Sequence, residues 1–144
     1  MILKSSEGKM KIQKLPALLI LETDEIQSKG LAIALMKYFS TTHITHNPSE
    51  AIKLTRLNSF SLIISETHFE SMNEFEVVKS LKRNNPDAEV FLTSSHFTPA
   101  TRSRFAELDI RNFFEKPLEV KKIQQKINDL ITYFILKNQK EDLP

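Results

Sequence analysis

The chain alternates short apolar runs with longer segments of helical periodicity, and this alternation limits its fold more than any other feature. The runs at Ala17–Leu21, Leu62–Ser65 and Val90–Leu92 are too short for helices and are typical of strands covered on both faces. Thr41–Thr45 is short and β-branched, and Asn112–Glu115 is short and aromatic, so both are also predicted to be strands. The sequence therefore predicts five strands.

The segments between these runs carry apolar residues at three- and four-residue steps, which predicts amphipathic helices. Helices are expected over about 26–38, 49–57, 74–83, 99–108 and from near 119 to the end of the domain. The last helix is expected to be about two turns longer than the others, and it carries an apolar stripe down its length. In the first helix the apolar residues at this spacing are Ile26, Ile33, Met36 and, just past its end, Phe39, with Leu31 and Leu35 beside them.

Five strands alternating with five helices predict an α/β fold with an open parallel sheet that has helices on both faces. The flavodoxin-like strand order 2-1-3-4-5 places the carboxyl ends of the first and third strands side by side, at the switch point where ligands bind in such sheets. Glu22 follows the first strand and Glu66 ends the third. We therefore expect these two carboxylates to face each other.

The chain of 144 residues fits one domain. Residues 1–16 are polar and lysine-bearing without periodicity, so they are predicted to be a flexible N-terminal tail. The domain is predicted to cover 17–136, including the extended last helix, and 137–144 is predicted to be a C-terminal tail.

Composition excludes several classes of function. The balance of 20 basic against 18 acidic residues gives a net charge of +2, and no basic face or helix-turn-helix segment indicates nucleic-acid binding by this domain. There is no cysteine and no apolar segment of membrane-spanning length, so we expect a cytoplasmic protein without membrane contact. With only Gly8 and Gly30, the chain lacks a glycine-rich loop for nucleotide phosphates. Its histidines do not have the spacing of a metal or catalytic site: His43, His46, His68 and His96.

Four polar features follow predicted strands at one edge of the sheet: an acidic stretch from Glu22, then Glu66, Thr93 and Lys116 with Pro117. The segments that carry them read LLILETDE, LIISETHFESMNEFEVV, VFLTS and FFEKPL. Together they resemble the receiver domain of two-component response regulators, in register from residue 18 to residue 131. The resemblance implies a signalling module of a phosphorelay rather than an enzyme.

The chain departs from the family pattern at two positions. Glu66 stands where the resemblance implies an aspartate that accepts phosphate, and Thr23 stands where it implies a second metal-binding acid, with Asp24 beside it. A misplacement of about 1 Å can cost on the order of 10²-fold in rate, so the longer Glu66 side chain should impair phosphoryl transfer severely. No cofactor is expected, and Glu22 with Glu66 would bind Mg²⁺ only weakly. We therefore predict a pseudo-receiver.

Two interpretations of Glu66 remain open. By reaching Lys116 and the Thr93 hydroxyl it could mimic a phosphorylated aspartate, because a charge-assisted hydrogen bond of about 1.5–3 kcal/mol can bias a two-state switch. Phe113 would then be the inward-turned aromatic switch residue that the resemblance implies. Alternatively Glu66 and Lys116 form a structural ion pair, Thr93 caps the fourth helix, Phe113 belongs to the core, and Lys116-Pro117 forms a turn, with the cis bond that the resemblance implies.

The resemblance also implies how such a module would act. Its contact surface would lie on the fourth helix, the fifth strand and the fifth helix, and its partners would be proteins of a signalling pathway or a second copy bound through helices four and five. A competing hypothesis is a working, Mg²⁺-dependent receiver that uses Asp24 or Ser65 as an unconventional acceptor. The predicted surface residues are Arg102, Arg104, Phe105, Phe113 and Lys122.

Overall fold

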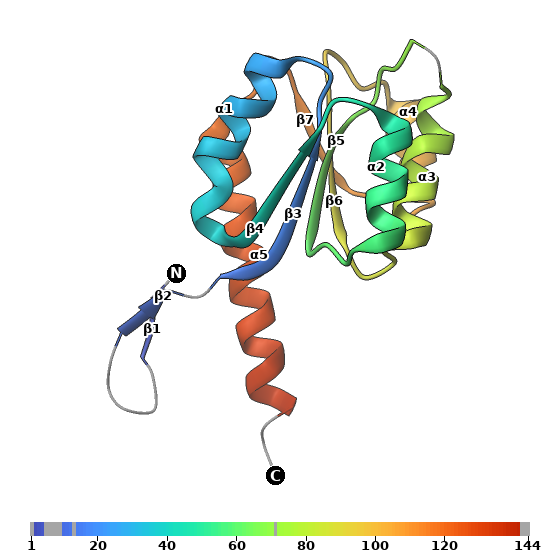
Figure 1. Cartoon of the computed structure of the whole chain (residues 1–144). Coiled ribbons are helices and arrows are strands. Elements are labelled where there is room, and N and C mark those ends of the chain that lie inside the picture. The colour runs from blue at the N-terminus through green and yellow to red at the C-terminus, as the bar shows by residue number, and fades with distance from the viewer. Residues whose placement is uncertain (1, 5–9, 13, 71, 142–144) are drawn as a thin grey trace.

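A computed structural model describes residues 2–4, 10–12, 14–70 and 72–141 of the chain. Its main sheet has five parallel strands in the order β4-β3-β5-β6-β7 (Figure 1), which confirms the predicted flavodoxin-like order 2-1-3-4-5. The strands are β3 (Leu15–Leu21), β4 (Phe39–Thr45), β5 (Leu62–Glu66), β6 (Glu89–Ser94) and β7 (Asn112–Glu115).

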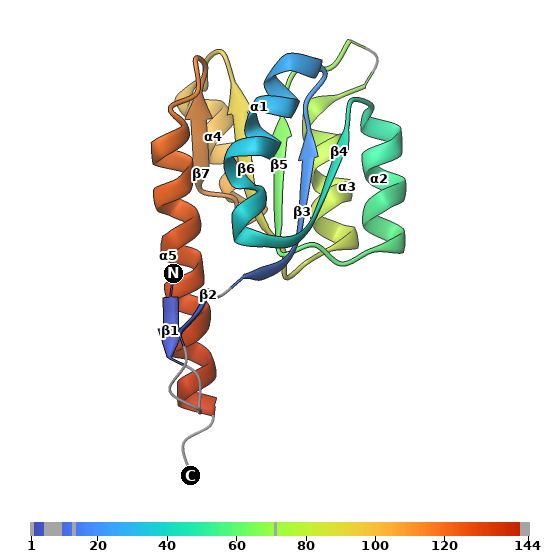
Figure 2. The same cartoon turned by 60° about the vertical axis from the view of Figure 1, so that its left-hand side comes forward.

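Helices cover both faces of this sheet. Helices α1 and α5 lie on one face, and α2, α3 and α4 lie on the other, as Figures 1 and 2 show from two sides. None of the helices in the described ranges is long and apolar enough to cross a membrane. The helices are α1 (Glu25–Leu35), followed by the 3-10 turn η1 (Met36–Tyr38), then α2 (Pro48–Leu57), α3 (Glu74–Asn84), α4 (Pro99–Ala106) and α5 (Val120–Glu141).

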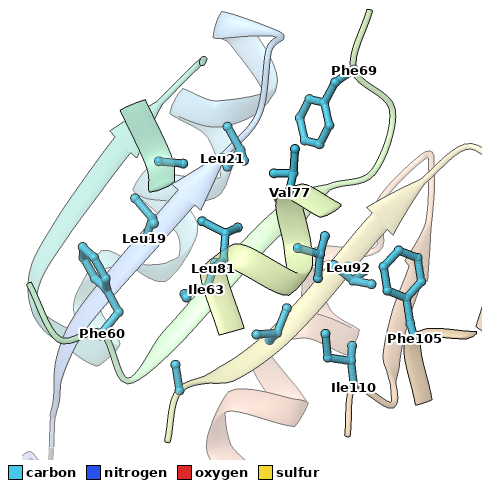
Figure 3. Close-up of a cluster of buried hydrophobic side chains, with 14 of the residues drawn as sticks. Leu19, Leu21, Phe60, Ile63, Phe69, Val77, Leu81, Leu92, Phe105 and Ile110 are labelled. Carbon is cyan, nitrogen blue, oxygen red and sulfur yellow. The ribbon is translucent and has the colours of Figure 1, made fainter. Parts of the chain in front are cut away.

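The continuous apolar runs become central strands because both of their faces are buried. Along β3 and β5, successive side chains point alternately into two separate cores. Leu19 and Ile63 pack with helices α2 to α4 (Figure 3), whereas Ile20 and Ile64 pack against α1 and α5. These strands are paired in parallel register, so their carboxyl ends lie at the same edge of the sheet.

Short polar side chains cap four of the helices, and each accepts a hydrogen bond from a backbone N–H in the first turn. Thr98 is the cap of α4 and accepts from the amide of Thr101. The interpretation of Thr93 as the cap of this helix is therefore wrong, because Thr93 lies within β6, several residues earlier. The caps of α1, α2 and α3 are Asp24, Asn47 and Asn73.

Helix α1 buries a different face from the one that its isoleucines suggest. Ser28, Leu31 and Leu35 are buried, whereas Ile26 is 84% and Ile33 is 73% exposed. The helix carries two adjacent apolar stripes, one of isoleucines and one of leucines. Only the leucine stripe packs against the sheet, in the same core as α5. The predicted helix is present, but only one of its two apolar stripes contributes to the core.

This arrangement predicts that Ile33→Lys leaves stability nearly unchanged. The side chain is largely in water, so we expect a change in the free energy of unfolding within about 0.5 kcal/mol. Urea denaturation of the native and variant chains at low concentration measures the difference. A loss above about 2 kcal/mol would mean that Ile33 belongs to the core after all.

The two ends of the chain differ from the predicted boundaries. Strands β1 (Ile2–Lys4) and β2 (Met10–Ile12) pair in antiparallel fashion within the segment predicted as a tail, and β3 begins at Leu15 rather than at residue 17. Helix α5 continues to Glu141, through part of the predicted C-terminal tail, and extends past the end of the sheet in Figure 1. Residues 1, 5–9, 13 and 142–144 lie outside the described residues, so the predicted tails stay a prediction there.

Candidate functional site

The carboxyl edge of the sheet brings together the polar residues that follow its strands. Glu66 ends β5 and is paired in register with Thr93 of β6. Lys116 follows β7 and Glu22 follows β3, the strand next to β5. The structure thus gathers these four residues, which are as much as 94 positions apart in sequence, at the switch point of the sheet.

An ion-pair network fills the centre of this edge. The Lys116 Nζ atom lies 2.7 Å from Glu22 Oε1 and 3.7 Å from Glu66 Oε2. The second oxygen of each carboxyl group accepts a backbone hydrogen bond: Glu22 Oε2 from the amide of Asp24 at 3.0 Å, and Glu66 Oε1 from the amide of Thr23 at 2.8 Å. All four carboxyl oxygens therefore face a donor within the protein.

Both glutamates are buried, with Glu22 2% and Glu66 6% exposed, and their pKa values move in opposite directions. Burial raises the pKa of Glu66, and its hydrogen bond to Glu22 raises that pKa further against the opposing effect of Thr23. Burial would also raise the pKa of Glu22, but hydrogen bonds from Glu66, Lys116 and Asp24 outweigh it and lower that pKa. When the pair holds one proton, that proton therefore resides on Glu66, and Glu22 carries the charge opposite Lys116.

The raised pKa makes a prediction about Glu66→Gln. The folded protein holds the Glu66 proton more tightly than the unfolded chain does, so the native protein loses stability as pH rises from the ordinary value of 4.5 through the raised value. The side-chain amide introduced by Glu66→Gln would keep an acceptor for the Thr23 amide and offer a donor to Glu22. We therefore expect the variant to be more stable than the native protein by about 1 kcal/mol at pH 8.

That advantage should shrink to near zero well below pH 4.5, where Glu66 is protonated in both the folded and the unfolded state. Urea titrations over this pH range measure it, with the exposed Glu70→Gln as the matched control. A variant that is less stable than the native protein at pH 8 would show that ionised Glu66 stabilises the fold, against this account.

The switch residues lie beside this network, and only part of the predicted contact set is formed. Among the described residues, Glu66 reaches Lys116 but has no hydrogen bond to the Thr93 hydroxyl. Thr93 is buried, and its carbonyl accepts a hydrogen bond from Thr67 at 3.3 Å. The peptide bond between Lys116 and Pro117 is cis, as the resemblance implies.

Phe113 is a half-buried residue of β7, and its side chain packs against the core cluster that includes Phe105 of α4. Its ring centroid lies 5.1 Å from that of Phe97 and 6.5 Å from that of Phe105. The Arg102 guanidinium lies 5.0 Å from the Phe113 centroid and pairs with Glu115 at 3.4 Å. The Arg102 guanidinium therefore lies over the Phe113 ring, and its ion pair with Glu115 orients it there.

The predicted contact surface needs one correction. Phe105 is only 1% exposed, because its ring packs under α4 against Phe75 and the core, so it cannot be a contact residue. Arg104 stacks over Phe75 at 4.0 Å, and Lys122 pairs with Glu119 on the exposed side of α5.

A pocket of about 350 Å³ opens next to Glu66 and Lys116. Several of its lining residues were not predicted, because hydroxyl side chains are too common in sequence to stand out. The role of His46 was also not predicted. Its Nδ1 atom hydrogen-bonds the Glu22 carbonyl at 2.8 Å, which connects the end of β3 to the turn before α2. The pocket is lined by Glu66, Thr67, His68, Glu74, Thr93, Ser94, Ser95, His96, Phe97, Thr101 and Lys116.

These residues do not fit a bound Mg²⁺ ion, which favours several oxygen ligands in octahedral geometry. Within the described part of the chain, no three acidic, histidine or cysteine side chains cluster closely enough to hold a metal. The oxygens of Glu22 and Glu66 already face Lys116 and two backbone amides, and Asp24 Oδ1 accepts from the amide of Gln27 as the cap of α1.

The parallel sheet, with two buried glutamates and a lysine at its carboxyl edge, is a flavodoxin-like fold, and sequence comparison identifies the family. A model of the response regulator receiver domain matches residues 18–128. The chain belongs to this family of signalling modules. The prediction from the four sequence segments is confirmed.

One curated relative is a probable transcriptional regulator, ycf29, of Pyropia yezoensis. It is 28% identical over 123 residues, which cover 83% of this chain and 55% of the relative. The chain thus spans about half the length of this curated relative.

Solved structures of response regulators show the same fold. A CheY-like receiver domain protein of Methanospirillum hungatei JF-1 superposes with a TM-score of 0.76 at 14% identity, covering 89% of this chain and 99% of that chain. A response regulator of Burkholderia pseudomallei, solved with a phosphorylated aspartic acid, calcium ion and citrate, has a TM-score of 0.71 at 20% identity, covering 90% of this chain and 76% of that chain.

Proposed function

We propose that this receiver signals through protein contacts and is not phosphorylated at position 66. The observation that carries the proposal is the closed network of Glu22, Glu66 and Lys116, in which every carboxyl oxygen faces an internal donor. Burial raises the pKa of Glu66, and both of its carboxyl oxygens already face donors, the Thr23 amide and Lys116. Lys116 is held by Glu22 instead of being free for an incoming phosphoryl group.

The contacts of the alternative acceptors weigh against a working phosphoacceptor site. Ser65 is fully buried, and its hydroxyl donates to the Glu66 carbonyl at 2.8 Å. The Asp24 carboxylate caps α1. Phosphate on either residue would require breaking a contact that the folded chain already makes.

The half-buried Phe113 supports a switch held near its signalling position without phosphate. Its packing on Phe97 and Phe105, together with the charge of Arg102 above it, holds the ring against α4. The face of α4, β7 and α5 that includes Arg102, Arg104, Phe113 and Lys122 would then be available to a partner at all times. Contact through this face does not depend on Mg²⁺.

The proposed partner is a protein of a signalling pathway or a second copy bound through α4 and α5. Exposed Tyr133, Phe134 and Leu136 on the long α5 support a contact along this helix, since exposed apolar patches mark interaction sites. The name of the Pyropia yezoensis relative suggests transcription as the process that the contacts control. We propose no nucleic-acid contact by this domain itself.

Incubation with acetyl phosphate and Mg²⁺, followed by intact mass spectrometry, tests the proposal. We expect the native chain to keep its mass, and a receiver with the usual aspartate provides the positive control. Addition of one phosphoryl group would overturn the proposal. Mapping that group to Asp24 or Ser65 would establish the unconventional acceptor instead.

A further inference from the structure

The outer face of α1 has features that nothing within a single copy of the chain explains. Ile26 is 84%, Ile33 is 73% and Met36 is 56% exposed, although the other side of the helix is well packed. Large apolar side chains that gather on one exposed helix face mark an interaction surface. Helix α1, which carries the surface defined by Ile26, Gly30 and Ile33, lies on the opposite side of the sheet from α4 (Figure 1).

Gly30 lies between the two isoleucines on this face. Glycine is the least favourable residue in a helix interior apart from proline, so its presence calls for a structural reason. A Cβ atom built on Gly30 would meet nothing within 4 Å. Packing inside one copy therefore does not require glycine, whereas a second helix crossing closely at this point would.

The sequence of α1 is suited to pairing with itself. Gly30 is the central residue of Glu25–Leu35, so a two-fold axis through it would place the isoleucines of both copies around the crossing point. The helix begins with Asp24 and Glu25, and Lys37 follows its carboxyl end. In an antiparallel pair, the acidic start of each helix lies near the lysine of the other, and the two helix dipoles oppose each other.

We propose that this chain self-associates through an antiparallel α1–α1 contact centred on Gly30. Glu25 pairs with Lys29 of its own helix at 3.2 Å on the surface. The occupant of the surface is a second copy, because the acidic start of the helix and Lys37 after its end complement the same groups of an antiparallel copy. The contact is small, so it is a weak and reversible association. It uses residues other than those of the α4–α5 surface, and it adjoins the acidic network through Asp24, which caps α1 and whose amide bonds Glu22.

Sedimentation equilibrium from micromolar to millimolar concentration is the first test. We expect the apparent mass of the native chain to rise from 16.6 kDa toward twice that value. Ile33→Glu should weaken association about tenfold or more, whereas Leu57→Glu, at a 70% exposed position of α2, should leave it unchanged. A native chain that stays monomeric throughout, or an Ile33→Glu chain that associates like the native one, would overturn the proposal.

Substitution of Gly30 should change the stability of the monomer and the strength of association in opposite directions. Gly30→Ala should raise the melting temperature of the monomer, because alanine favours helix, and should weaken association, because its methyl group obstructs the crossing. Unchanged or stronger association of this variant would overturn the proposal. The melting temperature shows that the chain remains folded.

Charge exchange and cross-linking test the geometry. Glu25→Lys and Lys37→Glu should each weaken association, and the double variant should restore it. The sequence has no cysteine, so Lys29→Cys introduces a single exposed thiol next to the proposed two-fold axis while leaving Gly30 in place, and a short bis-maleimide should cross-link this thiol between two copies. Leu57→Cys is the control. Equal cross-linking of both variants, or a dimer lost in Phe134→Glu but kept in Ile33→Glu, would overturn the proposal.

Discussion

Replacing Lys116 by methionine is expected to lower the free energy of unfolding by about 3 kcal/mol at pH 8. Removing one partner of a buried ion pair costs about 3–5 kcal/mol, and the 22% exposure of the Lys116 side chain places the expected loss at the low end. Glu22 would keep its negative charge in a buried site beside Glu66 without a cation. Urea denaturation at constant ionic strength measures the loss.

The pH dependence of this loss identifies its cause. Without Lys116, the pKa of Glu22 should rise, so the variant recovers stability as pH falls and the buried carboxyl takes up a proton. Lys122→Met is the matched control, because Lys122 pairs with Glu119 at an exposed site and should change stability by less than about 1 kcal/mol. Equal losses in the two variants, or a Lys116→Met loss that does not vary with pH, would contradict an electrostatic role for the network.

The double variant Thr23→Asp with Glu66→Asp is expected to accept phosphate from acetyl phosphate in the presence of Mg²⁺. The shorter side chain at 66 withdraws the carboxylate from the space a phosphoryl group needs, and the acid at 23 supplies a second metal ligand. Correcting a misplacement of about 1 Å corresponds to on the order of 10²-fold in rate. Intact mass spectrometry over time gives the rate for the native, single-variant and double-variant chains.

We expect the Glu66→Asp single variant to be intermediate, because it still lacks the second acid. A folded double variant that takes up no phosphate would show that residues other than 23 and 66 disable the site. Circular dichroism and the denaturation midpoint establish that each variant is folded. Phosphate uptake by the native chain at the rate of the double variant would contradict the account directly.

The strand positions were predictable because continuous apolar runs have few alternatives. Leu62–Ile64 is too short for a helix and too apolar for an exposed strand, and the structure places it at the centre of the sheet. The alternation with helices predicted an open parallel sheet, and right-handed crossovers leave few strand orders for such a sheet, among them the flavodoxin-like order that is observed. The carboxyl edge could therefore be predicted before any coordinates, together with the position of Glu66 on it.

The details that were missed depend on contacts between distant segments. Spacing alone could not distinguish the two apolar stripes of α1, because Ile33 and Leu35 are equally apolar and only packing against α5 separates them. Asn85, just after the end of α3, was not predicted to have a structural role. It is buried and bonds the Phe60 amide at 2.6 Å and the Thr55 carbonyl at 2.7 Å, a role that no local pattern encodes.

The residues of the network, Glu22, Glu66 and Lys116, were predicted, but their hydrogen bonds to the backbone were not. Glu22, Glu66 and Lys116 were expected to meet, but the sequence does not show that backbone amides of residues 23 and 24 would take one oxygen of each carboxyl group. Those amides point inward because the chain turns from β3 into the cap of α1. The Thr23 amide and Lys116 thus hold Glu66, and no hydrogen bond to the Thr93 hydroxyl forms among the described residues.

The closed network of Glu22, Glu66 and Lys116 leaves neither a free acceptor carboxylate nor a free cation for a phosphoryl group, and an NMR measurement can show whether this is so. The backbone amide and Phe113 ring signals of the native chain are recorded before and after addition of Mg²⁺ and beryllofluoride, a phosphoryl mimic, with the double aspartate variant as the positive control. The account predicts that the signals of Thr93 and Phe113 do not move in the native chain and shift in the variant. Shifts of both signals in the native chain would show a working receiver and contradict the account.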